Sequence, residues 1–416
     1  MREAEHGTGG LAEEPPGRWL TLAFLAAGLL LAMAPWFSAS AVAPVLAARW
    51  GLGAAGTAWL TISVQLGFVA GALVSAVLTL SDRWSARRLI AGCAVVAGVA
   101  TVGVAVAPTA GAAIVLRLLT GAALAGVYPP GMKLAAGWFR EARGWAIGVL
   151  VGALTVGSAL PHLLRWSVPG ELWRSVLGSA GVSALIGAGL VLVVPHDGPY
   201  AAPAPRFTWR AVPRILSDRA LALANLGYLG HMWELYAMWT WMAVFIAASE
   251  QAHGGDAAGG ALPALLTFAV VGSGAVGCWL GGLYADRWGR TVVTSVAMMI
   301  SGACALSAGL VFGRPLGALV PLLVVWGVTV VADSAQFSTA VSELAPPDHV
   351  GTALTLQTSL GFLLTCVTIY LLPAVAGRIG WRWSMSVLAL GPACGVWAML
   401  ALRRRPEALR LAGGRR

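Results

Sequence analysis

Very few charges divide this sequence into long stretches that contain no Asp, Glu, Lys or Arg. The longest of these stretches are 19–48, 50–81, 89–116, 257–285 and 351–377. Roughly 20 apolar residues in a helix cross a hydrocarbon core about 30 Å thick, so each stretch is long enough to span a membrane. Only 11% of the 416 residues are charged, whereas a soluble domain carries roughly 25%. The chain is therefore expected to be an all-α integral membrane protein.

Gly and Pro residues and single charges resolve these stretches into twelve predicted transmembrane helices. A β-barrel is not expected, because its strands alternate over only about 10 residues. The predicted helices span 19–42, 57–80, 88–107, 110–131, 144–165, 173–194, 220–248, 262–284, 291–312, 316–342, 350–373 and 382–402. They group into an N-terminal half (1–194), a Pro- and Arg-rich linker (195–219), a C-terminal half (220–402) and a basic tail (403–416).

Basic residues are shared unevenly between the predicted loops. If the N-terminus is cytoplasmic, cytoplasmic segments hold 20 of the 27 Lys and Arg residues and the opposite loops hold six. Cytoplasmic loops of membrane proteins are enriched in positive charge. Both termini are therefore expected in the cytoplasm, and the chain in the inner (cytoplasmic) membrane. Its net charge of +10 would face anionic lipid, and nucleic acid is not expected as a partner.

A short motif recurs at about half the chain length. Asp82-Arg83-Trp84 is repeated as Asp286-Arg287-Trp288, each in a loop between two antiparallel predicted helices. The second copy, Gly282-Leu-Tyr-Ala-Asp286-Arg287-Trp-Gly289-Arg290, resembles the loop signature of the major facilitator superfamily. In the fourth predicted helix, Arg117-Leu-Leu-Thr-Gly121 is similar to a second pattern of that superfamily. The repeat predicts two pseudo-symmetric six-helix halves with the substrate site between them.

The resemblance implies a role for the loop residues. In the superfamily these side chains latch neighbouring helix ends on the cytoplasmic side in the outward-facing state. The residues so implied are Asp82, Arg83, Asp286, Arg287, Gly282, Gly289 and Arg290. Anchoring at the anionic cytoplasmic face of the membrane is the alternative for Arg290, and Lys133, the only lysine, is interpreted as such an anchor.

Four ionisable side chains fall deep inside predicted helices: Arg117, His231, Glu234 and Asp333. Charged groups there cost at least about 2.5–3.5 kcal/mol each, so each is a functional candidate. They lie on helices four, seven and ten, which the resemblance assigns to the central cavity. Glu234 or Asp333 is interpreted as a proton acceptor that alternates between surroundings with and without Arg117. A static ion pair with Arg117 is the alternative, and for His231 it is a hydrogen bond to a helix carbonyl.

Aromatic side chains concentrate on the seventh predicted helix, with Trp233 and Tyr236 near its centre. Together with Trp36 and Tyr128, they are candidates for the wall of a largely apolar substrate cavity. Packing in the protein core or against lipid is the alternative. A buried Arg on one cavity helix and a His on another favour a small organic anion as substrate.

These features predict a secondary transporter that moves a small solute, an organic anion or a metabolite, by proton-coupled symport. A proton-coupled drug exporter is the alternative, although its usual Gly-Pro signature is absent from the fifth helix. A membrane sensor with the same fold is an alternative of another class. No enzymatic activity, cofactor or metal site is expected, since the five cysteines and the acidic residues match no such pattern. The expected partners are the substrate, protons and lipid, and the chain is expected to act as a monomer.

Overall fold

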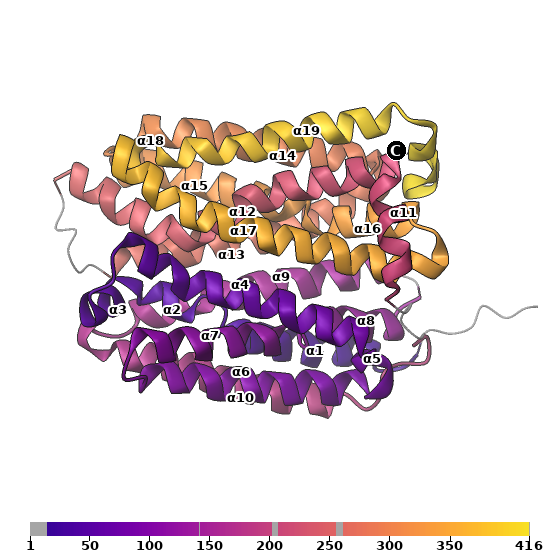
Figure 1. Cartoon of the computed structure of the whole chain (residues 1–416), viewed down its shortest axis with the longest axis horizontal. Helices are drawn as coiled ribbons and strands as arrows, with labels where there is room; N and C mark the ends of the chain where they lie inside the picture. Colours follow the sequence, from indigo (N-terminus) through magenta and orange to yellow (C-terminus); the bar gives the residue numbers. More distant parts are fainter. Residues whose placement is uncertain (1–14, 141, 202–206, 255–260, 416) are drawn as a thin grey trace, which may run out of the picture.

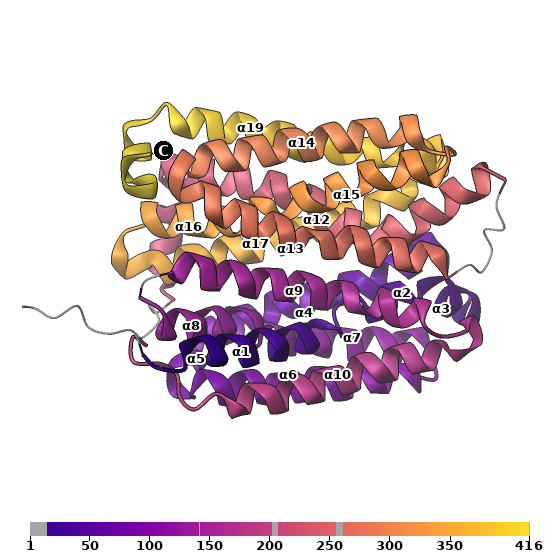
Figure 2. The same cartoon turned by 180° about the vertical axis from the view of Figure 1, so that it is seen from behind.

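The computed structural model describes residues 15–140, 142–201, 207–254 and 261–415, and these contain helices but no strand. The helices form two bundles that lie one above the other, with long axes nearly parallel (Figures 1 and 2). The lower bundle in Figure 1 comes from the N-terminal half of the chain and the upper bundle from the C-terminal half.

The N-terminal half makes six passes along its bundle. Its helices are α1 (Arg18–Met33), α2 (Ser38–Ala41), α3 (Ala43–Trp50), α4 (Ala54–Val77), α5 (Leu80–Arg83), α6 (Ala86–Ala105), α7 (Ala110–Leu124), α8 (Tyr128–Trp138), α9 (Arg143–Trp166) and α10 (Trp173–Val193). The end of the molecule that carries α5 is called the α5 end below, and the end that carries α3 is called the α3 end (Figure 1).

The C-terminal half repeats this plan after a connecting segment that contains α11 (Val212–Ser217). Its helices are α12 (Arg219–Ala252), α13 (Leu262–Trp288), α14 (Arg290–Val311), α15 (Leu316–Ala332), α16 (Ser334–Leu344), α17 (Val350–Ile379), α18 (Trp381–Ser384) and α19 (Leu390–Arg403), followed by the 3-10 segment η5 (Pro406–Gly414). Ten spans in the described chain are long and apolar enough to cross a membrane. The 34-residue α12 and the broken run α1–α3 complete the twelve predicted passes.

Four passes predicted as single helices are broken. One is the twelfth, 382–402, in which the 3-10 segment η4 (Met385–Ala389) separates α18 from α19. The first predicted helix, 19–42, is interrupted after α1 at Ala34-Pro35 and continues through α2 and α3 to Trp50. The fourth breaks between α7 and α8, where two prolines open the new helix, because a proline ring clashes with the preceding turn and lacks an N–H donor. The tenth breaks at Asp333, between α15 and α16. The breaks leave backbone carbonyls near the middle of the molecule that need donors.

Glycines fix the closest helix pair in each half. In the N-terminal half, α4 packs on α7, and a Cβ at Gly121 would overlap the Val64 carbonyl. In the C-terminal half, α13 packs on α15, and a Cβ at Gly277 would overlap the Val328 carbonyl. Close approach of backbones through small residues is a principal source of helix association in membranes. The matching contacts confirm the predicted pseudo-symmetry of the two halves.

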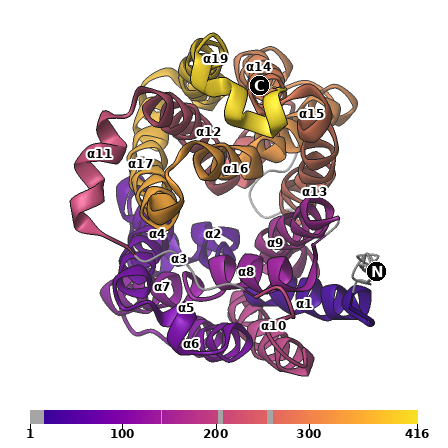
Figure 3. The ribbon, with the colours of Figure 1, turned by 90° about the vertical axis from the view of Figure 1, so that its right-hand side faces the viewer.

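The two halves meet along two pairs of helices. One pair is α9 with α13 and the other is α4 with α17, and both lie between the bundles in the end-on view (Figure 3). Between these pairs the halves face each other across α8, α2, α12 and α16 (Figure 3).

The basic tail predicted over 403–416 is folded against the protein at the α5 end. Ala408 and Leu411 of η5 are fully buried, and the Ala412 N–H donates to the Glu343 carboxylate at 3.1 Å. The side chain of Arg415 donates to the Asp286 carbonyl. The apolar residues within this basic segment explain why it packs instead of extending into solvent.

Candidate transport site

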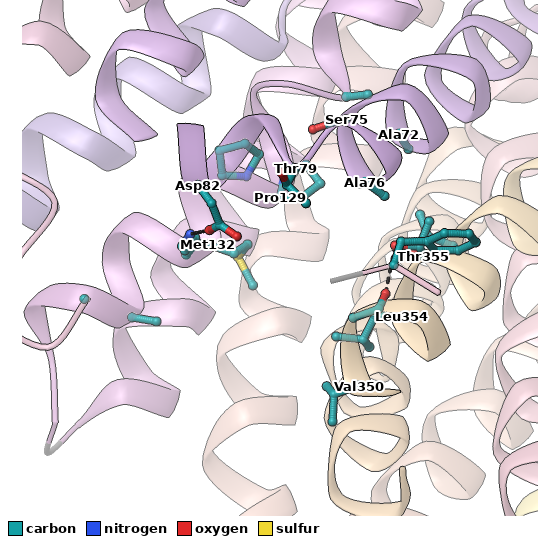
Figure 4. A pocket seen from close by; sticks show the side chains of 18 of the residues that line it. Ala72, Ser75, Ala76, Thr79, Asp82, Pro129, Met132, Val350, Leu354 and Thr355 are labelled. Carbon is teal, nitrogen blue, oxygen red and sulfur yellow. Dashed lines mark hydrogen bonds and ion pairs between the residues drawn. The ribbon is translucent and has the colours of Figure 1, made fainter. Parts of the chain in front are cut away.

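A cavity of about 530 Å³ lies between the two halves at the α5 end (Figure 4). On one side α4 presents Ala72, Ser75 and Ala76, and the turn between α4 and α5 presents Thr79; on the other side α17 presents Val350, Leu354 and Thr355 (Figure 4). On each helix these residues recur every three or four positions, as expected for one helical face. A volume of this size suits a small organic molecule.

The cavity contains hydroxyl groups and one paired charge. Ser75, Thr79, Tyr200, Thr355 and Thr358 supply the hydroxyls, and most of the remaining lining is apolar. The two charged lining residues, Asp82 and Lys133, form an ion pair of 2.6 Å between Nζ and Oδ1. Asp82 is thus the predicted site residue that borders the cavity, and Lys133 acts as its partner as well as lying near the membrane surface.

Aromatic side chains from both halves close the cavity toward the α3 end. From the N-terminal half, Trp36 contacts Phe68 with ring centroids 5.0 Å apart. Across the interface, Phe68 lies 4.4 Å from Phe362 of α17, and Trp36 lies 5.8 Å from Tyr236 of α12. Phe37 and Trp239 extend this group, which we call the aromatic seal: Trp36, Phe37, Phe68, Tyr236, Trp239 and Phe362. The structure thus brings together Trp36 and Tyr236, two of the predicted site residues.

Arg117 lies fully buried beside the break in the first pass. Its Nη1 donates to the Pro35 carbonyl at 2.6 Å and to Ser38 Oγ at 3.2 Å, its Nη2 donates to the Trp36 carbonyl, and its Nε donates to the Leu60 carbonyl at 3.1 Å. No carboxylate of the described residues forms an ion pair with it. The static ion pair with Arg117 is therefore absent from this conformation, in which carbonyls of the helix break and of α4 take up its donors, and the proposed alternation stays a prediction.

Glu234 is buried inside the C-terminal half. One carboxylate oxygen accepts from Trp326 Nε1 of α15 at 2.7 Å, and the other accepts from Ser301 Oγ of α14 at 2.8 Å. Both partners belong to the same half as Glu234. The side chain therefore points into its own helix bundle, and it does not line the cavity that the described residues form.

His231 and Asp333 form a second buried polar pair in that half. His231 Nδ1 lies 2.9 Å from Asp333 Oδ1, and both side chains are almost completely excluded from solvent. Asp333 lies at the break between α15 and α16, and His231 precedes Glu234 by about one turn of α12. The interpretation of His231 as a donor to a helix carbonyl is replaced by this contact with a carboxylate. The predicted charges of helices seven and ten are thus neighbours, but they are turned away from the cavity.

The remaining predicted residues are divided between the cavity wall and the core. Trp233 donates to the Val387 carbonyl at 3.2 Å and packs within the C-terminal half. Tyr128 begins α8 beside the cavity residues Pro129 and Pro130, and it is close enough to Tyr228 and Tyr236 of the other half for electrostatic interaction.

The second-half copy of the loop motif forms a network of ions. Asp286 pairs with Arg290 at 3.1 Å, and Arg290 also binds the Glu343 carboxylate at 2.8 Å and the Gln336 side chain at 2.8 Å. Gly289, between α13 and α14, has φ = 90°, a conformation that favours glycine. Gly282 faces Gly144 of α9, so this helix end contacts the other half without a side chain between them. The side chains of Arg83 and Arg287 are exposed.

Four residues of these sites escaped sequence reasoning: Ser301, Trp326, Phe68 and Phe362. Ser301 and Trp326 look like ordinary members of apolar helices, and nothing in their spacing points to Glu234. Phe68 and Phe362 lie on helices that carry no charge over these turns. Pro35 was a usable signal, because a proline inside the first predicted helix indicates a break that needs a donor such as Arg117.

Two six-helix halves around an interfacial cavity, sealed at one end, define a membrane transport protein. The sequence model of the Major Facilitator Superfamily matches residues 25–369, and the chain belongs to this superfamily. It is a multi-pass secondary transporter.

The chain is also similar to individual known proteins. A Thermoproteus tenax protein described as an uncharacterized 38 kDa protein in the 23S RNA operon is 28% identical over 309 residues, which cover 71% of this chain and 74% of that protein. A bacterial homologue of the human lysosomal transporter Spinster, solved inward-facing and unoccupied, superimposes with a TM-score of 0.72 at 15% identity over 94% of this chain and 98% of that one. A mutant of the nucleoside transporter NupG gives a TM-score of 0.69 at 16% identity over 92% and 99%. At these identities the two solved structures support the fold alone.

Proposed function

We propose that this transporter moves a small organic solute across the cytoplasmic membrane by alternating access, driven by protons. The observation that carries the proposal is the cavity between the halves, which lies at the α5 end and is closed toward the α3 end by the aromatic seal. Rocking of the halves would part the aromatic seal and bring α4 and α17 together at the α5 end.

The α5 end is proposed to face the cytoplasm. By the predicted topology, 20 of the 27 Lys and Arg residues belong to cytoplasmic segments, and those of them that the structure describes lie at this end. The cytoplasmic side of membrane proteins carries such an excess. The described conformation is then inward-open, and both termini lie in the cytoplasm.

Glu234 is proposed as the proton-binding residue because its surroundings suit both protonation states. As a carboxylate it accepts one hydrogen bond on each oxygen, from Trp326 and from Ser301. Ser301 Oγ also lies 3.2 Å from the Met298 carbonyl. When Glu234 is protonated, its hydroxyl can donate to Ser301, and Ser301 can turn its own hydrogen to Met298. The proton can therefore bind without displacement of any heavy atom.

The groups that face Glu234 make its charge sensitive to rearrangement of the C-terminal half. Asp333 and the Cys304 thiol lie near enough to interact with it electrostatically, and His231 lies one turn away on α12. No described cation pairs with Glu234. A shift of α15 that separates Trp326 from the carboxylate would remove one of two stabilising hydrogen bonds and favour proton uptake.

Two tests address this proposal, and the first needs no known substrate. The first follows the reactivity of Ser75→Cys in the cavity toward an impermeant maleimide between pH 5.5 and 8.5, with the parent protein as the blank for native cysteines. Because the thiolate is the reactive form, each rate is divided by that of free cysteine at the same pH. The normalised reactivity should change with pH, and Glu234→Gln, which preserves both hydrogen-bond partners, should remove that change. Glu250→Gln, on the same helix but near its end, is the matched control. A pH response unaffected by Glu234→Gln would refute the assignment of the proton to Glu234.

The second test joins the two faces of the cavity. A disulfide or short cross-link between Ala76→Cys and Leu354→Cys should abolish flux in proteoliposomes, and reduction should restore it. Flux with the cross-link intact would exclude alternating access through this cavity. Solute movement against the proton gradient would identify the exporter alternative, and binding without flux in the reduced protein would identify a sensor.

A further inference from the structure

The deep positive charge of Arg117 is not available to a substrate. Four of its hydrogen bonds go to Pro35, Trp36, Leu60 and Ser38, all in the N-terminal half. A guanidinium has five N–H donors, so almost its whole capacity is used. This arrangement removes the reason for expecting an organic anion, since an anion would have to displace backbone carbonyls at the helix break.

The carboxylates in and near the cavity are likewise unavailable to a charged substrate. Glu234 and Asp333 are enclosed by residues of the C-terminal half. Asp82 and Lys133, which do border the cavity, neutralise each other at 2.6 Å. Among the described residues, the cavity lining therefore presents no uncompensated charge. An ion that gave up water to bind this lining would gain no unpaired charged partner in return.

Buried polar groups with no hydrogen-bond partner among the described residues lie in and just beyond the aromatic seal that closes the cavity. Gln65 of α4 is fully buried, and neither its amide nitrogen nor its oxygen has a partner among the described residues. It shares the α4 face of Ala72 and Ser75 and lies one turn beyond Phe68. Trp36, whose ring contacts Phe68, is buried with its Nε1 likewise unpartnered in the described chain.

Leaving these groups unpaired is costly, because an unbonded buried polar group costs roughly 1–3 kcal/mol by mutational estimates. A carboxamide offers both a donor and an acceptor, and an indole N–H offers a donor. The aromatic rings around them provide flat apolar surfaces for stacking. A ligand that satisfied this end would therefore be flat, uncharged, and equipped with a hydrogen-bond donor and acceptor.

We infer that the substrate is an uncharged planar molecule with a carboxamide or lactam-like group, which binds Gln65 and the Trp36 N–H when the aromatic seal opens around it. This inference rests on the proposed function, because it concerns the inner end of the same transport cavity. It names the substrate class that the residues of that end would select.

The test compares three probes that share one ring and differ in charge: indole-3-acetamide, indole-3-acetate and tryptamine. Binding to the purified full-length protein is measured by isothermal titration calorimetry. Indole-3-acetamide should bind at least tenfold more tightly than the anion or the cation. Equal or tighter binding of either charged probe, or no binding of any probe, would overturn the inference.

Matched variants locate the recognition. Gln65→Leu should weaken indole-3-acetamide binding at least tenfold. Ser63→Ala should leave it unchanged, since Ser63 is also buried with an unpartnered hydroxyl but lies on the other side of α4. If Gln65→Leu fails to fold, Gln65→Asn is used, and the charge preference of the unaltered protein remains decisive. Equal losses in both variants would contradict the role of Gln65.

Failure here is distinguishable from failure of the proposed function. Preference for a charged probe, together with flux that the Ala76→Cys/Leu354→Cys cross-link abolishes, would contradict the inferred substrate class and support the proposed transport function. Preference for indole-3-acetamide, together with flux that the cross-link does not change, would support the substrate class and contradict the proposed transport function.

Discussion

Replacement of Arg117 by methionine tests whether this residue stabilises the helix break in the first pass or binds ligands. Methionine keeps a long, flexible side chain and removes every donor. The Pro35 and Trp36 carbonyls then lose their charged donor, and Pro35 retains the Ser38 hydroxyl at 2.8 Å. The Trp36 carbonyl is the one left without a donor, and a buried group left unsatisfied costs about 1–3 kcal/mol. Removing a desolvated guanidinium offsets part of this loss, and the expected net loss is about 1–2 kcal/mol.

The assay is reversible unfolding in mixed micelles of dodecylmaltoside and increasing SDS, which gives the free energy of unfolding of each variant. Arg117→Lys, with one ammonium in place of a planar fork, should lose about half as much. Arg174→Met is the control, because Arg174 also donates to a carbonyl, at 3.1 Å, but is exposed. Its loss should stay below about 1 kcal/mol. Equal losses for Arg117→Met and Arg174→Met would refute the structural role of Arg117.

Three further outcomes are expected. Asp82→Asn should lower flux without loss of folded protein in the membrane, as seen by gel filtration, because it removes the ion pair with Lys133 that borders the cavity; unchanged flux would count against a latch. Gly121→Ala should cost about 1–3 kcal/mol of unfolding free energy by forcing α4 from α7, whereas Gly178→Ala, with open space around it, should be neutral. Leu411→Asp should release η5 and expose the 406–415 segment to trypsin, while Leu409→Asp, already half exposed, should not; equal cleavage would exclude docking through Leu411.

The twelve passes could be predicted from sequence because membrane insertion imposes a requirement of length and charge that the chain displays directly. The repeat of Asp82-Arg83-Trp84 at Asp286-Arg287-Trp288 likewise located the matching loops. The helix breaks were less visible. The first pass was predicted to end at residue 42, but it ends at Trp50 because α2 and α3 continue it after the break. No run of charged residues marks this end in the sequence.

The direction of each deep side chain could not be predicted. A helix with one apolar stripe reveals which face is buried, but α12 is buried on every side, so its sequence gives no reference for the orientation of Glu234. The depth of a charged side chain in the membrane follows from its position along the helix. The direction in which the side chain points depends on how the helix is rotated about its own axis. That rotation is fixed by contacts between remote residues, such as Glu234 with Trp326, 92 positions later.

The deep charged side chains of this protein do not meet at one site. Charges that sequence reasoning assigned to one central cavity are divided between the interiors of the two halves: Arg117 stabilises a helix break in one, and Glu234 with the His231–Asp333 pair lies inside the other. A substrate in the cavity and a proton on Glu234 would then never share a site. Their coupling would have to pass through the packing of α12, whose Tyr236 belongs to the aromatic seal and whose Glu234 lies two residues away on the opposite side of the helix. A rotation of α12 that opens the aromatic seal would also move the carboxylate relative to Ser301 and Trp326, which links solute access to proton binding without contact between the two ligands.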